Sequence, residues 1–199
     1  MSSSLISLRV STRNAHKVRE ITAILGPSFR IFDLSGLASM PEIAETGDTF
    51  EENAALKAVA VSQVSGGWVI ADDSGLEVDA LGGAPGVYSA RYSGNEATDF
   101  GNNALLLRNL RHVRGKERRA RFRCVIVLAR DGRKLAAFDG AVEGIIANQP
   151  KGSEGFGYDP LFIPDGFCQT FGELPAVTKN RLSHRAMALE RLREWDGWR

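Results

Sequence analysis

Cysteine is scarce in this chain of 199 residues, in which Cys124 and Cys168 are the only cysteines. Two thiols are too few for disulfide bonds to stabilise a protein of this size. Cys124 also lies in an apolar run that predicts a buried strand. We therefore expect a reduced, cytoplasmic compartment.

Long hydrophobic runs are missing as well. The longest apolar run, residues 124–129, is far shorter than the roughly 20 residues that cross a bilayer as a helix. The first residues, MSSS, lack the basic segment and long apolar core of a signal peptide. We expect no membrane partner and no leader.

An excess of charge of one sign is also absent. Lys and Arg number 25 and Asp and Glu 24, which gives a formal net charge of +1. Such a chain has no general attraction for nucleic acids or membranes, so any attraction for an anionic ligand must be local. Neither internal repeats nor low-complexity linkers interrupt residues 1–199, and their length and composition predict a soluble globular protein, either one domain or two lobes sharing a cleft.

Several catalytic motifs do not occur. The GxxxxGK[ST] spacing of a Walker P-loop is absent, and so is the HExxH spacing of a zinc hydrolase. The histidines are scattered, and neither cysteine lies where a nucleophile is expected. The sequence therefore gives little support to a Cys–His hydrolase or a histidine-bound metal.

What the chain does contain is a pair of adjacent carboxylates, Asp72 and Asp73. They follow residues 68–71, an apolar run that predicts a buried strand, and glycines and Pro85 after them predict turns. Carboxylates at a strand end are unfavourable unless they are solvated, hydrogen-bonded or bound to a cation. The alternative is an Asx turn in which Asp73 caps its own loop. We place the working centre of the protein here, because other segments supply the partners of a metal-bound polyphosphate.

The N-terminal segment predicts a strand, a short turn and a helix. Residues 5–11 alternate apolar and polar side chains, residues 12–14 form the turn, and the helical spacing of residues 17–25 ends at Gly26. This order directs free backbone N–H groups toward a phosphate, and Lys17 adds a positive charge. The alternative is a surface lysine on an ordinary turn.

Thr49 and Glu52 form a capping box that begins a helix running to about Val64. Asn53 and Lys57 are four residues apart, so they share one face of that helix.

A basic run between residues 108 and 123 resembles a nucleic-acid patch. However, Arg119, Arg121 and Arg123 alternate with apolar residues, which favours the solvated face of a strand. A buried strand over residues 124–129 follows, then a hairpin turn at Asp131-Gly132. We expect a returning strand over residues 134–138 and a further strand over residues 140–146.

The segment at residues 155–160 combines glycines, aromatic rings and a carboxylate. It suits a loop that stacks on a flat ring, and the alternative is a tight turn whose Phe156 fills the core. Further on, Ser183 can cap the last helix, which places His184 and Arg185 in its first turn. Cations are unfavourable there unless an anion or an acceptor lies nearby.

Several separated segments together resemble the inosine/xanthosine triphosphate pyrophosphatase family. They are ADDSGLEVDALGGAPGVYSARYSG at residues 71–94, STRNAHK at 11–17, TFEENAALKA at 49–58, GFGYDP at 155–160 and KNRLSHRA at 179–186. Their common order over nearly the whole chain makes the match specific.

The resemblance implies an α/β fold, with a twisted mixed β-sheet, flanking helices and two lobes around a central substrate cleft. It implies a Mg²⁺-dependent enzyme that hydrolyses aberrant purine nucleoside triphosphates, namely ITP, dITP and XTP, to the monophosphate and pyrophosphate. It also implies a homodimer.

The resemblance also assigns roles to residues. Asp73 becomes the general base, Glu45 and Asp73 hold the metal with Asp72 as a further candidate, and Lys17 and Lys57 meet the phosphates. Lys179, His184 and Arg185 become base contacts. The full set of expected substrate residues is Thr12, Arg13, Asn14, Ala15, His16, Lys17, Lys57, Ser74, Phe156, Gly157, Tyr158, Asp159, Lys179, His184 and Arg185.

Two alternatives stay open at this point. A related family acts on modified pyrimidine nucleotides, but it does not share the Phe-Gly-Tyr-Asp loop. A nucleic-acid-binding module could instead use the basic run, and steep salt dependence of binding would favour it.

One position departs from the family pattern: Arg13 stands where relatives commonly have glycine, so it is either strained or an added cation near the phosphates.

Overall fold

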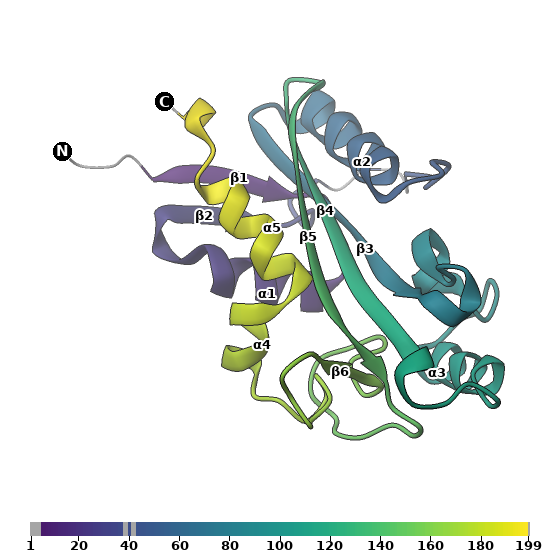
Figure 1. Ribbon diagram of the computed structural model, residues 1–199. Coiled ribbons are helices and arrows are strands. Elements are labelled where there is room, and N and C mark those ends of the chain that lie inside the picture. Colours follow the sequence, from purple (N-terminus) through teal and green to yellow (C-terminus); the bar gives the residue numbers. More distant parts are fainter. Residues whose placement is uncertain (1–4, 38–39, 41–42, 199) are drawn as a thin grey trace. The chain divides into compact units, whose positions relative to one another are not determined.

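The computed structural model describes residues 5–37, 40 and 43–198. Figure 1 shows helices and strands mixed along the chain. The elements are β1 Ile6–Val10, α1 Ala15–Leu25, β2 Phe29–Phe32, α2 Phe50–Ser65, β3 Trp68–Val78, α3 Asp99–Asn109, β4 Arg119–Arg130, β5 Arg133–Ile146, β6 Phe162–Pro164, α4 Ala176–Leu182 and α5 His184–Arg193. Short 3₁₀ turns connect several of them, including η3 at Gly86–Arg91.

The strands form a six-stranded sheet in the order β2-β1-β3-β4-β5-β6. β1 pairs in parallel with β2 and with β3, whereas β5 and β6 are antiparallel. The β4–β5 hairpin turns at Asp131 and Gly132, whose φ angles of 50° and 77° belong to the left-handed region that such a turn requires. The expected mixed α/β sheet with flanking helices is confirmed.

The chain divides into two compact units. Unit 1 takes the residues up to Asp73, Cys124–Gly140 and those from Arg185 onward, and unit 2 takes Ser74–Arg123 and Ala141–His184. The strands β3, β4 and β5 each contribute residues to both units. The predicted substrate cleft stays a prediction.

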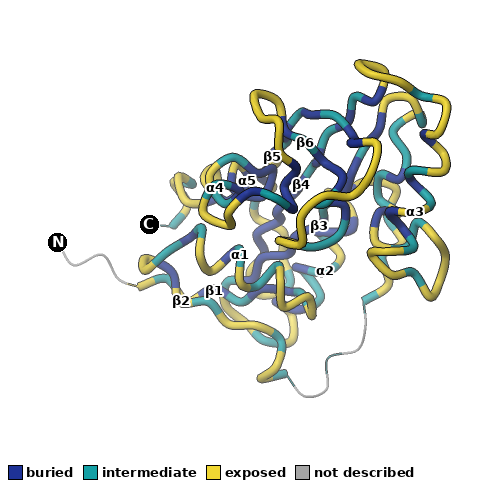
Figure 2. Tube along the Cα trace, turned by 90° about the horizontal axis from the view of Figure 1, so that it is seen from below, coloured by how far each residue is buried: buried dark blue, intermediate teal, exposed yellow. Residues whose placement is uncertain are grey.

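The core of unit 1 forms where helices α1 and α5 pack on the sheet. Its buried residues include Leu8 of β1, Ile21 of α1, Ile126 of β4 and Leu189 of α5. Figure 2 shows how buried positions gather along the sheet while the connecting segments are exposed. The alternating apolar pattern of β1 and the fully apolar stretch of β4 explain these positions.

The core of unit 2 is rich in aromatic rings. Phe122 lies with its ring centroid 4.8 Å from that of Phe162, which in turn lies 5.2 Å from Phe171. Arg118, within the basic run, is buried and donates hydrogen bonds to the carbonyls of Ile146 and Ala147. Arg118 therefore stabilises the backbone at Ile146 and Ala147 and does not belong to an exposed basic patch.

The remaining arginines of the run at the start of β4 face acidic side chains. Arg121 forms ion pairs with Glu143 at 2.8 Å and Asp79 at 2.9 Å, and Arg119 pairs with Asp165 at 2.7 Å. The predicted polar strand face is confirmed, because β4 begins at Arg119 and these side chains pair with acids of the same unit.

Three expectations about the elements were wrong or incomplete. β3 continues through Asp72 and Asp73 to Val78, so the two carboxylates lie inside a strand and not in a loop after it. β5 is one strand over Arg133–Ile146, where two strands were expected. Helix α4 was not predicted. The capping box of α2 is confirmed, with both of its reciprocal hydrogen bonds present.

Within the described part of the chain, the helices are too short or too polar to span a membrane.

Candidate active site

Asp72 is a fully buried, ion-paired carboxylate within β3. Its Oδ1 lies 2.6 Å from Lys17 Nζ, and its Oδ2 lies 2.6 Å from Arg185 Nε. Cys124 Sγ donates a further, weaker hydrogen bond to Oδ2 at 3.3 Å. Burial opposes ionisation, but Arg185 and Lys17 outweigh it and hold the pKa of Asp72 well below its ordinary value. Both oxygens of this carboxylate are thus engaged by side chains of the protein.

Arg185 links Asp72 to helix α1. The arginine side chain is 1% exposed, and its NH1 lies 2.5 Å from Glu20 Oε2. Although burial disfavours the cation, Asp72 and Glu20 raise the pKa of Arg185, which stays charged. The structure places the Arg185 guanidinium between two carboxylates of unit 1, and its expected contact with the base stays a prediction.

Asp73, the next residue, engages a different lysine. Lys57 Nζ lies 2.7 Å from Asp73 Oδ1 and 2.8 Å from Glu45 Oε1. Burial raises the pKa of Asp73, and Lys57 offsets only part of that effect. Burial likewise opposes the charge of Lys57, but Asp73 and Glu45 raise its pKa. The two neighbouring aspartates therefore have pKa shifts in opposite directions, as expected for side chains that leave a strand on opposite faces.

Glu45 and Asp73 converge on one point, which the ammonium of Lys57 occupies. No group of three or more His, Cys, Asp and Glu side chains that could hold a metal was found among the described residues. Mg²⁺, however, is commonly held by one or two carboxylates and completes its shell with waters and substrate phosphates. Two carboxylates converging on a cation therefore fit this metal.

The loop between β1 and α1 is held by its own side chains. Asn14 caps α1, because its Oδ1 accepts from the backbone N–H groups of His16 at 2.9 Å and Lys17 at 3.3 Å. Thr12 Oγ1 accepts from Asn14 N at 3.2 Å. The sequence predicted that free N–H groups would point at a phosphate, and two of these groups already have an acceptor.

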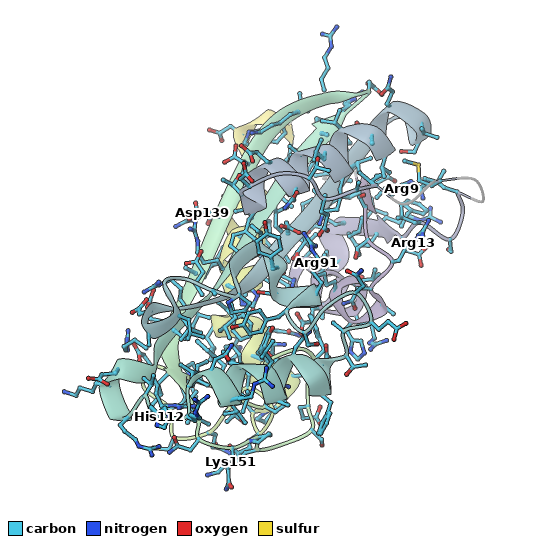
Figure 3. All side chains as sticks on the ribbon, turned by 90° about the vertical axis from the view of Figure 1, so that its right-hand side faces the viewer. Arg9, Arg13, Arg91, His112, Asp139 and Lys151 are labelled. Carbon is cyan, nitrogen blue, oxygen red and sulfur yellow. The ribbon has the colours of Figure 1, made fainter. Side chains whose placement is uncertain are left out.

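Arg13 adopts an unstrained backbone, since Asp131 is the one described non-glycine residue with positive φ. Its NH2 donates to the carbonyl of Met40 at 2.8 Å, and Figure 3 shows the exposed side chain at the same edge of unit 1 as Arg9. A cavity of about 420 Å³ adjoins the loop, with Thr12, Arg13 and Ala15 in its wall. Arginine in place of the common glycine is therefore an added cation and not a strained residue.

In unit 2, the segment around Phe156 is organised by one carboxylate. Asp159 Oδ2 accepts from Phe156 N at 2.9 Å and lies 2.5 Å from Lys179 Nζ. A side chain at Gly155 would bring its Cβ within 2.0 Å of the same oxygen, and the φ of +77° is also a glycine conformation. The Lys179 ammonium lies 4.9 Å from the centroid of the Phe156 ring, within cation–π range. Ring, lysine and carboxylate therefore form one cluster.

Tyr158 supports this loop from within the core. It is 3% exposed, and its hydroxyl donates to the carbonyl of Ser89 at 2.9 Å. Burial raises the pKa of Tyr158, so the hydroxyl remains a donor. Tyr158 was expected to contact substrate, but the structure encloses its side chain, whereas Phe156 is only partly buried.

His184, the first residue of α5, is 4% exposed. Its ring stacks on Phe122, with centroids 4.8 Å apart and planes within 14°. Ser74, the remaining expected substrate residue, lies in β3 directly after Asp73 and is partly buried.

Comparisons with known proteins agree with this geometry. The model of the Ham1 family matches residues 8–195. The chain belongs to the Ham1 family. Among its relatives, "dITP/XTP pyrophosphatase" of Bacillus licheniformis is 48% identical over 184 residues, covering 92% of this chain and 94% of that protein. The protein of the same name from Geobacter sulfurreducens is 50% identical over 192 residues, covering 96% of each. The solved structure of the Staphylococcus aureus Ham1 protein matches with a TM-score of 0.83 and 39% identity, over 94% of this chain and 96% of that one.

The family assignment confirms the resemblance that the separated motifs indicated. In this Ham1 chain, the expected phosphate and metal residues Lys17, Glu45, Lys57 and Asp73 do come together in unit 1. The expected base-loop residues Phe156, Asp159 and Lys179 come together in unit 2.

Sequence reasoning did not find every residue of this Ham1 site. Glu20 was missed, although it lies one helical turn after Lys17 and so shares its face of α1. Asp99 and Asn103 of α3, which contact Gly157, were missed as well. Their spacing of four residues, which would place both on one face of a helix, was the available signal. The contact of Cys124 with Asp72 had no signal in the sequence, because it joins neighbouring strands.

Proposed function

We propose that this Ham1 chain is a pyrophosphatase that hydrolyses noncanonical purine nucleoside triphosphates, with dITP, ITP and XTP as substrates. The products are the nucleoside monophosphate and pyrophosphate. The observation that carries the proposal is the paired arrangement of Lys57 with Glu45 and Asp73, beside Lys17 on Asp72. The printed name of relatives about half identical over nearly the whole chain supports the same activity.

Glu45 and Asp73 are the residues that would hold Mg²⁺. When bound, the ion neutralises phosphate charge and activates water for attack on phosphorus. Asp72 is a poorer ligand, because Lys17 and Arg185 already engage both of its oxygens. This assignment selects Asp73, and not Asp72, from the adjacent pair.

Asp73 would act as the general base. Burial raises the pKa of its carboxyl above the ordinary value, which favours acceptance of a proton from the attacking water. Hydrolysis at the α-phosphorus breaks the bond to the bridging oxygen, which leaves with pyrophosphate.

Lys17 and Lys57 would stabilise the charge that develops on the leaving pyrophosphate. Each lysine is mostly buried and fixed by a carboxylate, so little reorganisation is needed when the charge appears. Hydrogen bonds from Lys17 at 3.4 Å and Lys57 at 3.2 Å to the same backbone carbonyl, that of Asp72, bring the two ammonium groups together.

The cluster of Phe156, Asp159 and Lys179 would select the base. Hypoxanthine and xanthine carry a 6-oxo acceptor where adenine carries a 6-amino donor. A lysine ammonium that faces position 6 of the purine donates a hydrogen bond to the 6-oxo group. Facing the 6-amino group of adenine, the same ammonium has no acceptor, which can lower kcat/KM for adenine nucleotides by orders of magnitude. The partly buried ring of Phe156 offers a face for stacking.

A panel of nucleoside triphosphates tests the proposal. With Mg²⁺ present, pyrophosphate release from dITP, ITP and XTP should exceed release from dATP and ATP by at least about 100-fold in kcat/KM. Orthophosphate release, or equal rates on all purines, would contradict it.

The assembly and organisation are also part of the proposal. We infer one pyrophosphatase domain over residues 1–199, because β3, β4 and β5 run through both units, and a single cooperative unfolding transition would support it. The family resemblance supports a homodimer, which the mass in analytical ultracentrifugation tests. The free thiols of Cys124 and Cys168 suit the reducing cytoplasm.

A further inference from the structure

Helix α3 holds one residue of the base loop by both of its backbone groups. Asp99 Oδ2 accepts from Gly157 N at 2.7 Å, and Asn103 Nδ2 donates to Gly157 O at 3.0 Å. Asp99 and Asn103 are four residues apart, so they lie on one face of the helix. Neither residue has been assigned a role in the activity proposed above.

The helix that makes these contacts is itself firmly placed. Thr98 caps it by accepting from Gly101 N at 3.1 Å. The buried side chain of Asn102 accepts from Ser93 N at 2.8 Å and donates to Ser89 O at 3.3 Å. The same Ser89 carbonyl accepts from the Tyr158 hydroxyl. Loop and helix are therefore joined at two points, one at Gly157 and one through Ser89.

Gly157 depends on these hydrogen bonds for its orientation. It has a φ of +61°, and apart from the glycine itself and its two chain neighbours no atom lies within 4 Å of the place where a Cβ would stand. No side chain or backbone therefore packs against Gly157 on the side where a Cβ would project. Phe156 precedes it and Asp159 follows two residues later, so a rotation at Gly157 would change how the ring stands relative to Lys179 and Asp159.

We propose that Asp99 and Asn103 are positioning residues for base selection. They act through Gly157 and fix the geometry of the Phe156–Asp159–Lys179 cluster without touching the nucleotide. This inference rests on the proposed function and names the residues that set its specificity.

The test compares kcat/KM for inosine triphosphate and adenosine triphosphate in matched variants. Asp99→Ala removes the acceptor of Gly157 N, and Asn103→Ala removes the donor to Gly157 O. In each, the ratio of inosine to adenosine triphosphate should fall about 5- to 20-fold, the range of one lost hydrogen bond with a rigid partner. Most of the change should appear in KM for inosine triphosphate, because the phosphate-handling residues of unit 1 are untouched.

Conservative variants separate hydrogen bonding from charge and size. Asp99→Asn keeps an oxygen acceptor for Gly157 N while removing the charge, so it should restore most of the ratio. Asn103→Asp keeps the size of the side chain but removes the N–H donor. The ratio of kcat/KM for inosine and adenosine triphosphate should therefore fall as it does in Asn103→Ala. Asn109→Ala is the matched control on the same helix, since Asn109 Nδ2 contacts only the Tyr92 hydroxyl among the hydrogen bonds described for it. Its ratio should equal that of the wild type.

Hydrogen exchange provides a readout that does not depend on turnover. The amide of Gly157 should lose protection in Asp99→Ala and keep it in Asp99→Asn, because Asp99 is its acceptor. If Asn103→Ala fails to fold, Asp99→Ala decides the matter alone, since Asp99 is an exposed residue.

The outcomes are distinct. A fall in the ratio with rescue by Asp99→Asn supports the proposal. An unchanged ratio, or equal losses on both nucleotides, overturns it while leaving the proposed function intact. Failure of the wild type to release pyrophosphate from inosine triphosphate removes the proposed function, and this inference with it, before any variant is measured.

Discussion

The charged cluster of unit 1, around Asp72 and Asp73, and the loop cluster of unit 2, around Asp159, are built on different physical principles. In unit 1, charged side chains from α1, α2, β3 and α5 neutralise one another in buried positions, as Lys17 and Arg185 do around Asp72. In unit 2, backbone groups and rings dominate, and Lys179–Asp159 is the buried ion pair within the loop cluster. Charge suits the recognition of a triphosphate, whereas fixed donors and ring faces suit the recognition of a flat, neutral base.

The difference has an energetic consequence. Removing one partner of a buried ion pair leaves the other charge uncompensated, which destabilises more than the pair itself stabilises. Removing a backbone-directed hydrogen bond costs about 1 kcal/mol when the remaining group finds another partner. Substitutions in unit 1 should therefore have large effects on turnover or stability, and those in unit 2 should mainly change selectivity.

Asp73→Asn should have the largest effect on turnover. An amide cannot accept the proton and is a poor Mg²⁺ ligand, so we expect kcat to fall by about 10³-fold or more. Because burial raises the pKa of Asp73, its ionised form does not favour the folded state, and the thermal midpoint should change little. Kinetics at saturating Mg²⁺ measure the first effect and calorimetry the second. A variant with most of its turnover would remove Asp73 from the role of base.

Asp72→Asn should have the largest effect on stability. It leaves Arg185 and Lys17 buried without their counter-charge, and we expect a loss of about 3–5 kcal/mol in the free energy of unfolding at pH 7. The folded-state pKa of Asp72 is depressed, so its contribution is present above the ordinary pKa of 3.8 and is lost as pH falls through the folded value. Urea titrations at pH 7 and pH 2.5 should show the gap between variant and wild type narrowing at the lower pH, which lies below the ordinary pKa. A constant gap would mean that Asp72 is not the buried anion of this cluster.

Lys57→Ala should lower kcat by about 10²-fold, because it removes a preorganised cation from the leaving pyrophosphate. It also leaves Glu45 and Asp73 facing each other without the ammonium between them. Added Mg²⁺ should therefore raise the thermal midpoint of the variant more than that of the wild type. Equal midpoint shifts would argue against a shared position for lysine and metal, and Lys134→Ala, at an exposed ion pair with Glu51 on the surface, is the control.

Much of this comparison could be predicted from sequence, because local patterns carry it. The Thr49–Glu52 capping box placed α2, and through it the lysine at Lys57. What sequence could not supply were contacts between distant elements. The burial of Arg185 against Asp72 and Glu20 depends on how α5 packs on the sheet, and its position at a helix start suggested only that an anion lay near. The extension of β3 through both aspartates was missed because charged residues are poor strand formers, and their pairing in tertiary structure outweighs that preference.

Lys179→Met should compress selectivity with little effect on kcat, and it should also lower the free energy of unfolding because it leaves Asp159 buried without its counter-charge. It removes the donor that would face the 6-oxo group, so kcat/KM for inosine triphosphate should fall about tenfold more than that for adenosine triphosphate. Arg185→Lys should instead lower both values alike, because Arg185 contacts Asp72 and Glu20 in unit 1. If Arg185→Lys changes the ratio as Lys179→Met does, Arg185 reads the base as the family resemblance implied.

Tyr158→Phe should have the smallest effect and the most specific one. The substitution removes one buried hydroxyl and keeps the ring, which is 3% exposed in the core of unit 2. The Ser89 carbonyl keeps the hydrogen bond from Asn102, so no acceptor is left without a partner, and we expect a loss of about 1 kcal/mol in the free energy of unfolding. Because burial raises the pKa of Tyr158, the hydroxyl stays protonated near neutral pH, and this loss should not vary with pH there. The ratio of inosine to adenosine triphosphate should remain that of the wild type, since the side chain supports the loop from behind. A changed ratio with unchanged stability would instead make the Tyr158 hydroxyl a substrate contact. The hydroxyl would then donate to the nucleotide, and its role would not be limited to supporting the loop through the Ser89 carbonyl.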